Sequence, residues 1–201
     1  MFYTIGNVFA TINNRLTKRL DPYNPLDLPP NTVRVRTIEY VPDWSQASYE
    51  IAKHKDGTPD NIWDVYKSGT SFDDLLKGSS NVIEILGANT IGITSMSNMF
   101  SGCFAMTTVP LFDTSKVTDM SHMFDACSSL TAVPLFDTSN VTDMREMFAN
   151  CYAVETGALA LYQQASTQAN PPTNHSGTFR LCGRDTQTGA AELAQIPSDW
   201  K

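Results

Sequence analysis

The sequence contains no uninterrupted apolar run long enough to cross a bilayer. A membrane-spanning α-helix needs about 20 predominantly apolar residues, and polar residues break up every apolar segment of this 201-residue chain well before that length. The N-terminal segment also lacks the order of a secretory signal, because its only cations, Arg15, Lys18 and Arg19, follow its apolar residues instead of preceding them. We therefore expect neither a transmembrane segment nor export by the general secretory route.

Positive charge is scarce as well. The chain has 14 Lys and Arg against 21 Asp and Glu, which gives a formal net charge of -7 at pH 7. Proteins that bind the phosphate backbone carry a surplus of cations that displace counterions, so the composition argues against nucleic acid as a partner. The hydrophobic fraction of 41% is sufficient for a packed core, and we expect a folded protein.

The four cysteines lack any Cys-x-x-Cys pair, because they are spaced 24, 24 and 31 residues apart along the chain. Structural zinc sites are built on such close pairs, so this spacing argues against a metal site. Buried free thiols are the favoured interpretation, since free cysteine is among the most buried residue types. Disulfides between neighbouring copies of the repeat described next are the alternative. The four are Cys103, Cys127, Cys151 and Cys182.

A 24-residue repeat dominates the middle of the chain. Residues 109–127 read VPLFDTSKVTDMSHMFDAC and residues 133–151 read VPLFDTSNVTDMREMFANC, which differ at only five positions. A degraded copy begins at Phe72, and Phe179 with Cys182 restores the Phe-x-x-Cys pair near the C-terminus. The aligned apolar columns are Met96, Met120 and Met144; Met99, Met123 and Met147; and Phe100, Phe124 and Phe148.

The spacing within each copy predicts a helix and a strand. Met120, Met123, Phe124 and Cys127 follow an i, i+3, i+4, i+7 pattern, which predicts a two-turn helix with an apolar inner face. Four of the five differences, at 121, 122, 125 and 126, fall on the opposite face. The segment TTVPLFD that precedes the next turn predicts a short strand. A helix and a strand cannot bury their own apolar faces in 24 residues, so we expect the copies to stack, with their strands in a parallel sheet.

Catalytic and metal-binding interpretations of these residues are weak. Cys127 belongs to the inner face and His122 to the outer one, so a Cys–His nucleophile lacks its geometry. The repeat methionines align with Phe72 and Leu75 of the degraded copy, which favours core packing over a copper site. The stacked acids lack the dense oxygen ligands of a calcium site, and turn or cap duties account for them. We expect no enzyme, no metal and no cofactor. The stacked acids are Asp113 with Asp137 and Asp119 with Asp143.

The units FDTSKVTDMSHMFDAC and FDTSNVTDMREMFANC resemble those of the BspA-like leucine-rich-repeat proteins, whose tandem units have the form FDTSxVTxMxxMFxxC. The resemblance is specific over residues 72–155 and weaker toward the C-terminus. It implies a right-handed α/β solenoid, a leucine-rich-repeat-like stack of short parallel strands and short helices, and a role in surface recognition without catalysis. Familiar members are surface or secreted bacterial proteins, and related units occur in proteins encoded by phages and prophages of gut bacteria.

The ends of the chain are interpreted separately. Residues 1–20 carry a charge of +3, no acid and an apolar stripe at spacings of three and four, which predicts an amphipathic anchoring or oligomerisation helix. Residues 21–30 read as a proline-rich linker that holds this helix away from the solenoid; the alternative is that the helix folds back onto it. We assign 31–71 to an N-terminal cap, 72–167 to the repeats and 168–201 to a C-terminal repeat and cap. The stripe is Phe2, Ile5, Phe9, Ile12 and Leu16.

Recognition is the function that these observations favour. Phe104 and Tyr152 are the candidate contacts on the helix side, and Phe112 and Phe136 on the sheet side if they face outward, which the pattern leaves open. We expect a non-enzymatic phage virion component, a head or tail fibre or a decoration, that assembles in the host cytoplasm. Its residues 1–20 would bind virion proteins or other copies, and its repeats a host-surface protein or glycan. The alternative is a bacterial surface adhesin or a protein-interaction scaffold.

Overall fold

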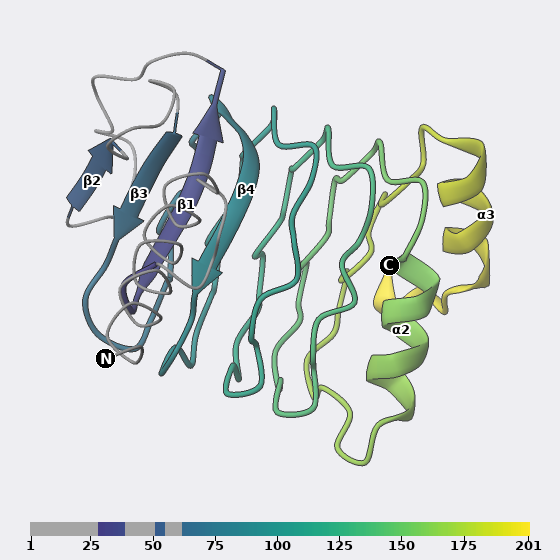
Figure 1. The fold of residues 1–201 in the computed structure, drawn as a ribbon. Helices are drawn as coiled ribbons and strands as arrows, with labels where there is room; N and C mark the ends of the chain where they lie inside the picture. Colours follow the sequence, from purple (N-terminus) through teal and green to yellow (C-terminus); the bar gives the residue numbers. More distant parts are fainter. Residues whose placement is uncertain (1–27, 39–50, 55–61) are drawn as a thin grey trace, which may run out of the picture.

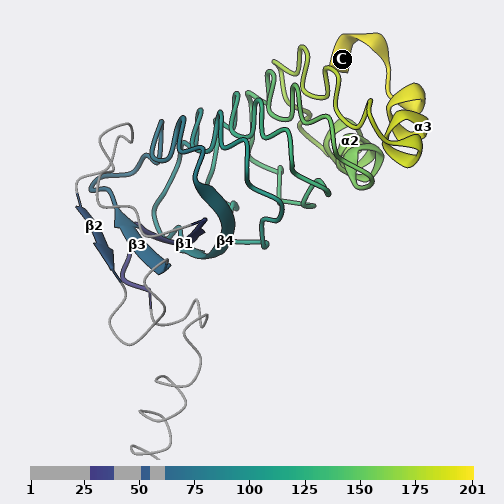
Figure 2. The same ribbon diagram turned by 90° about the horizontal axis from the view of Figure 1, so that it is seen from above.

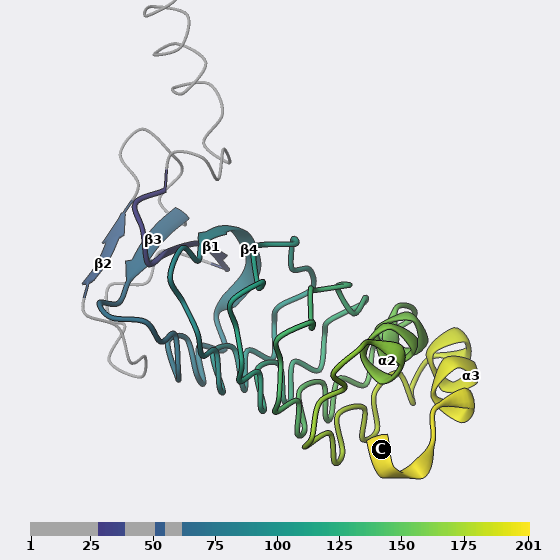
Figure 3. The same cartoon turned by 90° about the horizontal axis from the view of Figure 1, so that it is seen from below.

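The computed structural model describes residues 28–38, 51–54 and 62–201. Strands lie at one end of the molecule and helices at the other, and a series of turns lies side by side between them (Figures 1, 2 and 3). In chain order the elements are β1 (Thr32–Thr37), β2 (Ile51–His54), β3 (Ile62–Tyr66), β4 (Val82–Asn89), α2 (Ala158–Thr167), α3 (Gln187–Gln195) and the 3-10 helix η2 (Ser198–Trp200).

The four strands form one antiparallel sheet in the order β2-β3-β1-β4. The central strand, β1, alternates Val33 and Val35 with two arginines, and both valines are fully buried in the main core. Arg34 is buried as well, and its guanidinium donates two hydrogen bonds to the Asp64 carboxylate on β3, at 2.6 and 2.9 Å. This bidentate pair satisfies a charge that would otherwise be expensive to bury.

Each repeat copy contains two consecutive four-residue turns. The Met123 amide donates to the Met120 carbonyl at 3.2 Å, and the Cys127 amide donates to the Phe124 carbonyl at 3.0 Å. The third residue of each turn, His122 in the first and Ala126 in the second, has a positive φ, of 54° and 60° respectively. A left-handed third residue is the geometry of a type II turn.

The remaining amides join one copy to the next. The amides of residues 120, 122, 124 and 126 donate to the carbonyls of residues 143, 145, 147 and 149, at 2.8–2.9 Å. Each of the other pairs of neighbouring copies between Phe72 and Arg180 is also linked by four hydrogen bonds of this kind. Alternate amides thus close turns or bridge copies, so the buried backbone of the repeats has partners throughout this ladder.

The predicted fold class, an α/β solenoid of stacked parallel strands and short helices, is wrong. The positive φ angles at His122 and Ala126 are incompatible with an α-helix. The predicted strands reduce to isolated single-residue bridges, such as Glu84 with Thr108 and Ala132 with Thr156. The proline in each predicted strand has no N–H to donate. The four-stranded sheet is antiparallel. Among the described residues the α-helices are α2 and α3, which lie near the C-terminal end instead of once in each copy.

The repeat interior is a stack of phenylalanine rings. The ring centroids of Phe100 and Phe124 lie 5.3 Å apart, those of Phe124 and Phe148 5.0 Å, and those of Phe148 and Phe179 6.3 Å. Trp200 of η2 continues the stack at 6.3 Å from Phe179. The aligned columns of methionine, phenylalanine and cysteine are buried: Met96, Met120 and Met144; Met99, Met123 and Met147; Phe100, Phe124, Phe148 and Phe179; and the four cysteines. The prediction that these residues face the interior is confirmed.

Helix α2 explains why the last spacing between cysteines is 31 residues instead of 24. The helix is inserted after Gly157, whose φ is 97° and whose backbone lies against the Val133 carbonyl. Gln164 on α2 donates to the Phe136 carbonyl at 2.6 Å, so the insertion is tied to the side of the preceding copy. The repeat pattern resumes at Asn174, which bridges Asp143.

Candidate functional site

The four aromatic residues predicted as surface contacts lie in different environments. Phe104 is 52% exposed, as expected of a contact residue. Tyr152 is half-buried, and the Arg184 guanidinium lies 4.3 Å from its ring centroid. Phe112 is half-buried against the core. Phe136 is only 1% exposed and stacks with Phe124, so it does not meet the condition of facing outward on which it was offered as a contact.

Two exposed leucines were missed in the sequence. Leu111 and Leu135 occupy the same position in successive copies, and they are 64% and 50% exposed. Phe112 and Phe136, the next residues, turn inward and pack ring to ring at 4.8 Å. Side chains of an extended chain alternate between its two faces, so the leucines face outward because the phenylalanines face inward. The sequence pattern leaves the direction of the phenylalanines open, and therefore that of the leucines as well.

The leucines belong to a surface that we call the extended face, and the exposed Asp113 and Asp137 follow two residues after them. Its exposed members also include threonines whose hydroxyls are already engaged in the structure: Thr107 donates to the Ile83 carbonyl at 3.3 Å, and Thr131 to the Thr107 carbonyl at 3.2 Å. Engaged hydroxyls leave the leucines as the main groups available to a partner. The extended face comprises Thr107, Thr108, Leu111, Thr131, Ala132 and Leu135.

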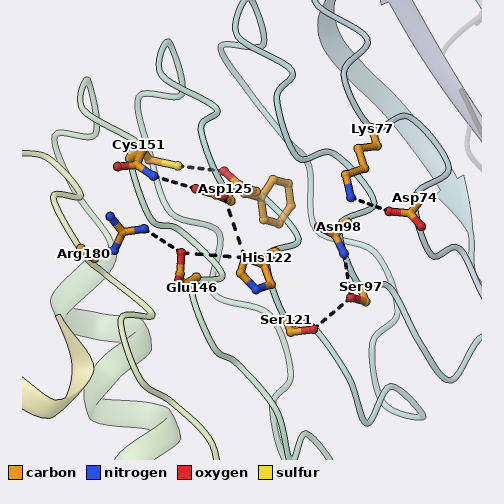
Figure 4. A network of polar contacts seen from close by, with 12 residues as sticks. Asp74, Lys77, Ser97, Asn98, Ser121, His122, Asp125, Glu146, Cys151 and Arg180 are labelled. Atoms are coloured by element: carbon orange, nitrogen blue, oxygen red, sulfur yellow. Dashed lines mark hydrogen bonds and ion pairs between the residues drawn. The ribbon is translucent and has the colours of Figure 1, made fainter. Parts of the chain in front are cut away.

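A polar cluster lies on the paired turns (Figure 4). His122 and Asp125 come from one copy and Glu146 from the next. The Nδ1 atom of His122 lies 3.9 Å from Asp125 Oδ2 and 3.9 Å from Glu146 Oε2. Arg180 donates to the same Glu146 oxygen at 2.6 Å, and Asn150 donates to the other Asp125 oxygen, Oδ1, at 2.9 Å. His122 was expected on the solvent side, and the structure places it there, 26% exposed, with its Nδ1 facing two carboxylates.

All four cysteines are free and buried. Burial raises the pKa of Cys103 and of Cys182 to about 12, and it raises the pKa of Cys127 well above its ordinary value. The Cys127 thiol donates to the Phe100 carbonyl at 3.2 Å, and the equivalent bond of Cys151 to the Phe124 carbonyl is 3.1 Å. The thiols are therefore neutral links between copies, which confirms the buried-thiol interpretation and excludes the disulfide alternative in this structure.

The stacked aspartates serve the turns. The Oδ1 atom of each accepts a hydrogen bond from the backbone amide two residues later, at 2.8–2.9 Å. The hydroxyl and the amide of Ser115 lower the pKa of Asp113, because both stabilise its ionised form. This arrangement confirms the turn role expected of these acids. They are Asp113, Asp119, Asp137 and Asp143.

The predicted anchor lies outside the described residues, so its stripe of Phe2, Ile5, Phe9, Ile12 and Leu16 stays a prediction. Within the part of the chain that the structure describes, no helix is both long enough and apolar enough to cross a membrane.

Comparison with known proteins places the chain in a family without assigning it an activity. Residues 63–172 match the family described as "Mycoplasma protein of unknown function, DUF285", and this match covers more than half of the chain. It includes the whole segment, 72–155, over which the tandem units are most regular. No curated protein and no solved structure matches the chain. The protein belongs to the DUF285 family.

Proposed function

We propose that this protein is a non-enzymatic binding and display module whose repeats present a surface to a partner and whose residues 1–20 attach it to a larger assembly. The observation that carries the proposal is the extended face, on which Leu111 and Leu135 are exposed at equivalent positions of neighbouring copies. Exposed apolar side chains grouped on a rigid support are typical of interaction surfaces. The support here is the ladder of hydrogen bonds between copies.

The packing of the repeats suits the presentation of a binding surface better than it suits catalysis. Their sulfur groups are buried and neutral, and their aspartates are engaged in turns. The groups that vary between copies lie outside this shared framework. A surface of this kind can change its contacts while its interior stays the same, which is how repeat proteins diversify binding.

We further propose that membership of DUF285 extends to the BspA-like repeat proteins, because two units have the form FDTSxVTxMxxMFxxC. Under this proposal the protein is a phage virion component, a head or tail fibre or a decoration, assembled in the host cytoplasm. Virion proteins or other copies would bind residues 1–20, and a host-surface protein or glycan would bind the extended face. The second candidate is a bacterial surface adhesin or interaction scaffold, which the family description, with its bacterial source, favours.

Particle composition tests the location. Purified virions from the producing host should contain the protein, as detected by mass spectrometry of washed particles. The full chain should also have a larger mass in solution than a chain lacking residues 1–20, measured by light scattering after size exclusion. Absence from virions together with presence on the bacterial surface would support the second candidate. Equal masses for the two chains would contradict the anchoring role.

Substitution of the exposed leucines tests the binding face. The double variant Leu111→Ser and Leu135→Ser should lose adsorption of the labelled protein to whole host cells, with an unchanged melting temperature because both side chains are exposed. Leu181→Asn is the matched control, since Leu181 is an exposed leucine outside the extended face. Loss of adsorption in the control, or its retention in the double variant, would refute this assignment.

A further inference from the structure

The cluster of His122, Asp125 and Glu146 has the composition of a metal site. One ligand atom from each side chain lies within 4.8 Å of the other two. Figure 4 shows the two carboxylates approaching the same edge of the imidazole, where both face Nδ1. The three residues are contributed by two neighbouring copies, and each side chain is 23–31% exposed, so water can reach the space between them.

The distances within the cluster are too long for hydrogen bonds between the imidazole and the carboxylates. At 3.9 Å, His122 Nδ1 is too far from either carboxylate oxygen for a hydrogen bond. Ligands bound to zinc at about 2.0–2.2 Å in a tetrahedron lie roughly 3.4 Å apart. The two separations from His122 Nδ1 are about 0.5 Å wider than that, and the ligand atoms of the two carboxylates lie within 4.8 Å of each other. Rotations of these half-buried side chains would bring the three atoms onto one ion.

Both carboxylates are already held by neighbouring groups. Asn150 occupies Oδ1 of Asp125, which leaves Oδ2 facing the imidazole, and Arg180 holds Glu146 at Oε2. Metal-binding carboxylates are usually fixed by such outer partners. The two carboxylates and Arg180 together leave one net negative charge, so a divalent cation is electrostatically favoured here.

The cluster is specific to one pair of copies. The residues equivalent to His122 and Asp125 in the preceding copy are Asn98 and Ser101. Asn98 has the same left-handed backbone, with a φ of 55°, so the turn forms equally well without the imidazole. The turn geometry therefore does not require these ligand groups.

We propose that His122, Asp125 and Glu146 bind one divalent transition-metal ion through Nδ1, Oδ2 and a Glu146 carboxylate oxygen, with water in the remaining positions, and that zinc is the ion best matched. Imidazole selects transition metals over calcium and magnesium. Three protein ligands plus water is a common zinc arrangement. Because the ligands come from two copies, the ion would cross-link neighbouring turns. The site is separate from the extended face and does not depend on the display function.

The test is calorimetric titration of the untagged, reduced full chain with zinc chloride at pH 7. The native protein should bind one zinc ion, and His122→Asn and Asp125→Ser should each weaken binding by about tenfold or more. Both replacements are the residues of the preceding copy, so the fold should be preserved. The matched control is His175→Asn, because His175 faces a single carboxylate, Asp199 at 3.3 Å, and should not affect zinc affinity.

Thermal melting supplies a second readout, since an ion that binds only the folded chain raises its melting temperature. Zinc should raise the melting temperature of the native and His175→Asn proteins and leave that of His122→Asn unchanged. Equal zinc affinities for the native, His122→Asn and Asp125→Ser proteins would overturn the proposal. So would the absence of binding to the native chain, or a loss in His175→Asn as large as that in His122→Asn.

Discussion

Truncation of Phe124 should be the most damaging change to the aromatic stack. Its ring is fully buried between Phe100 and Phe148, with centroids 5.3 and 5.0 Å away, and it lies 6.0 Å from Phe136. Replacing a buried phenylalanine by alanine destabilises by about 3–5 kcal/mol. Each aromatic pair adds about 0.5–1.5 kcal/mol beyond burial. Three ring contacts place Phe124→Ala at the upper end, about 5 kcal/mol, which approaches the whole stability of many domains.

Two further variants separate burial from stacking. Phe124→Leu keeps most of the apolar volume but loses the ring contacts, and should destabilise by roughly 1–3 kcal/mol. Phe112→Ala is the matched control, because Phe112 is half-buried and has one ring neighbour, Phe136 at 4.8 Å. Its truncation should destabilise by about 1–2 kcal/mol.

Urea unfolding followed by far-UV circular dichroism measures these differences as midpoints and slopes. The expected order of stability is native, then Phe112→Ala and Phe124→Leu, then Phe124→Ala. Equal midpoints for Phe124→Ala and Phe112→Ala would refute the interpretation that the ring stack holds the copies together. If Phe124→Ala is unfolded without urea, Phe124→Leu still tests it, because a midpoint equal to that of the native protein would mean that the rings contribute only their volume.

Three other changes have expected outcomes. Met123→Asp should abolish the folded circular dichroism spectrum, because it places a charge without a partner at a fully buried position, whereas Arg145→Ser, which restores the residue of the preceding copy, should not. Stability to urea should fall as pH rises above 9, because each buried thiol keeps its proton in the folded chain while the unfolded thiol loses it. Cys103, with a folded pKa of about 12, contributes roughly 1 kcal/mol of this loss between pH 9 and 10, and the loss should be smaller by that amount in Cys103→Ala. Gly157→Ala should lower the melting temperature more than Gly69→Ala, since both glycines have a positive φ but only the methyl at 157 would meet a backbone atom, the Val133 carbonyl oxygen at 2.3 Å.

The interior of the repeats could be predicted from the sequence because each copy repeats the same burial pattern. Met120, Phe124 and Cys127 recur in neighbouring copies, and a residue that is held constant while its neighbours change is expected to face a shared core. The buried positions of these residues confirm that expectation. The antiparallel sheet could not be derived in the same way, because β1 and β4 belong to different parts of the chain and pair over a long sequence separation.

The helix prediction failed because spacing alone does not define a helix. Two consecutive four-residue turns bury the same set, Met120, Met123, Phe124 and Cys127, that the inner face of an α-helix would bury. What distinguishes the turns is a left-handed residue at every fourth position, and the copies carry Gly102 and Asn150 at one of these positions. Glycine and asparagine are the residues that tolerate positive φ best, so their recurrence was the signal against a helix.

The polar cluster was missed for a related reason. A helix would have turned His122 toward solvent, away from any residue of the next copy. In the ladder, the His122 amide instead donates to the Arg145 carbonyl at 2.8 Å, which brings position 122 beside position 146. Side chains at the same repeat position of consecutive copies are therefore neighbours. At this position the two residues differ, so His122 lies beside Glu146. The identical residues that face inward form the shared core, whereas this polar cluster arises at positions where adjacent copies differ.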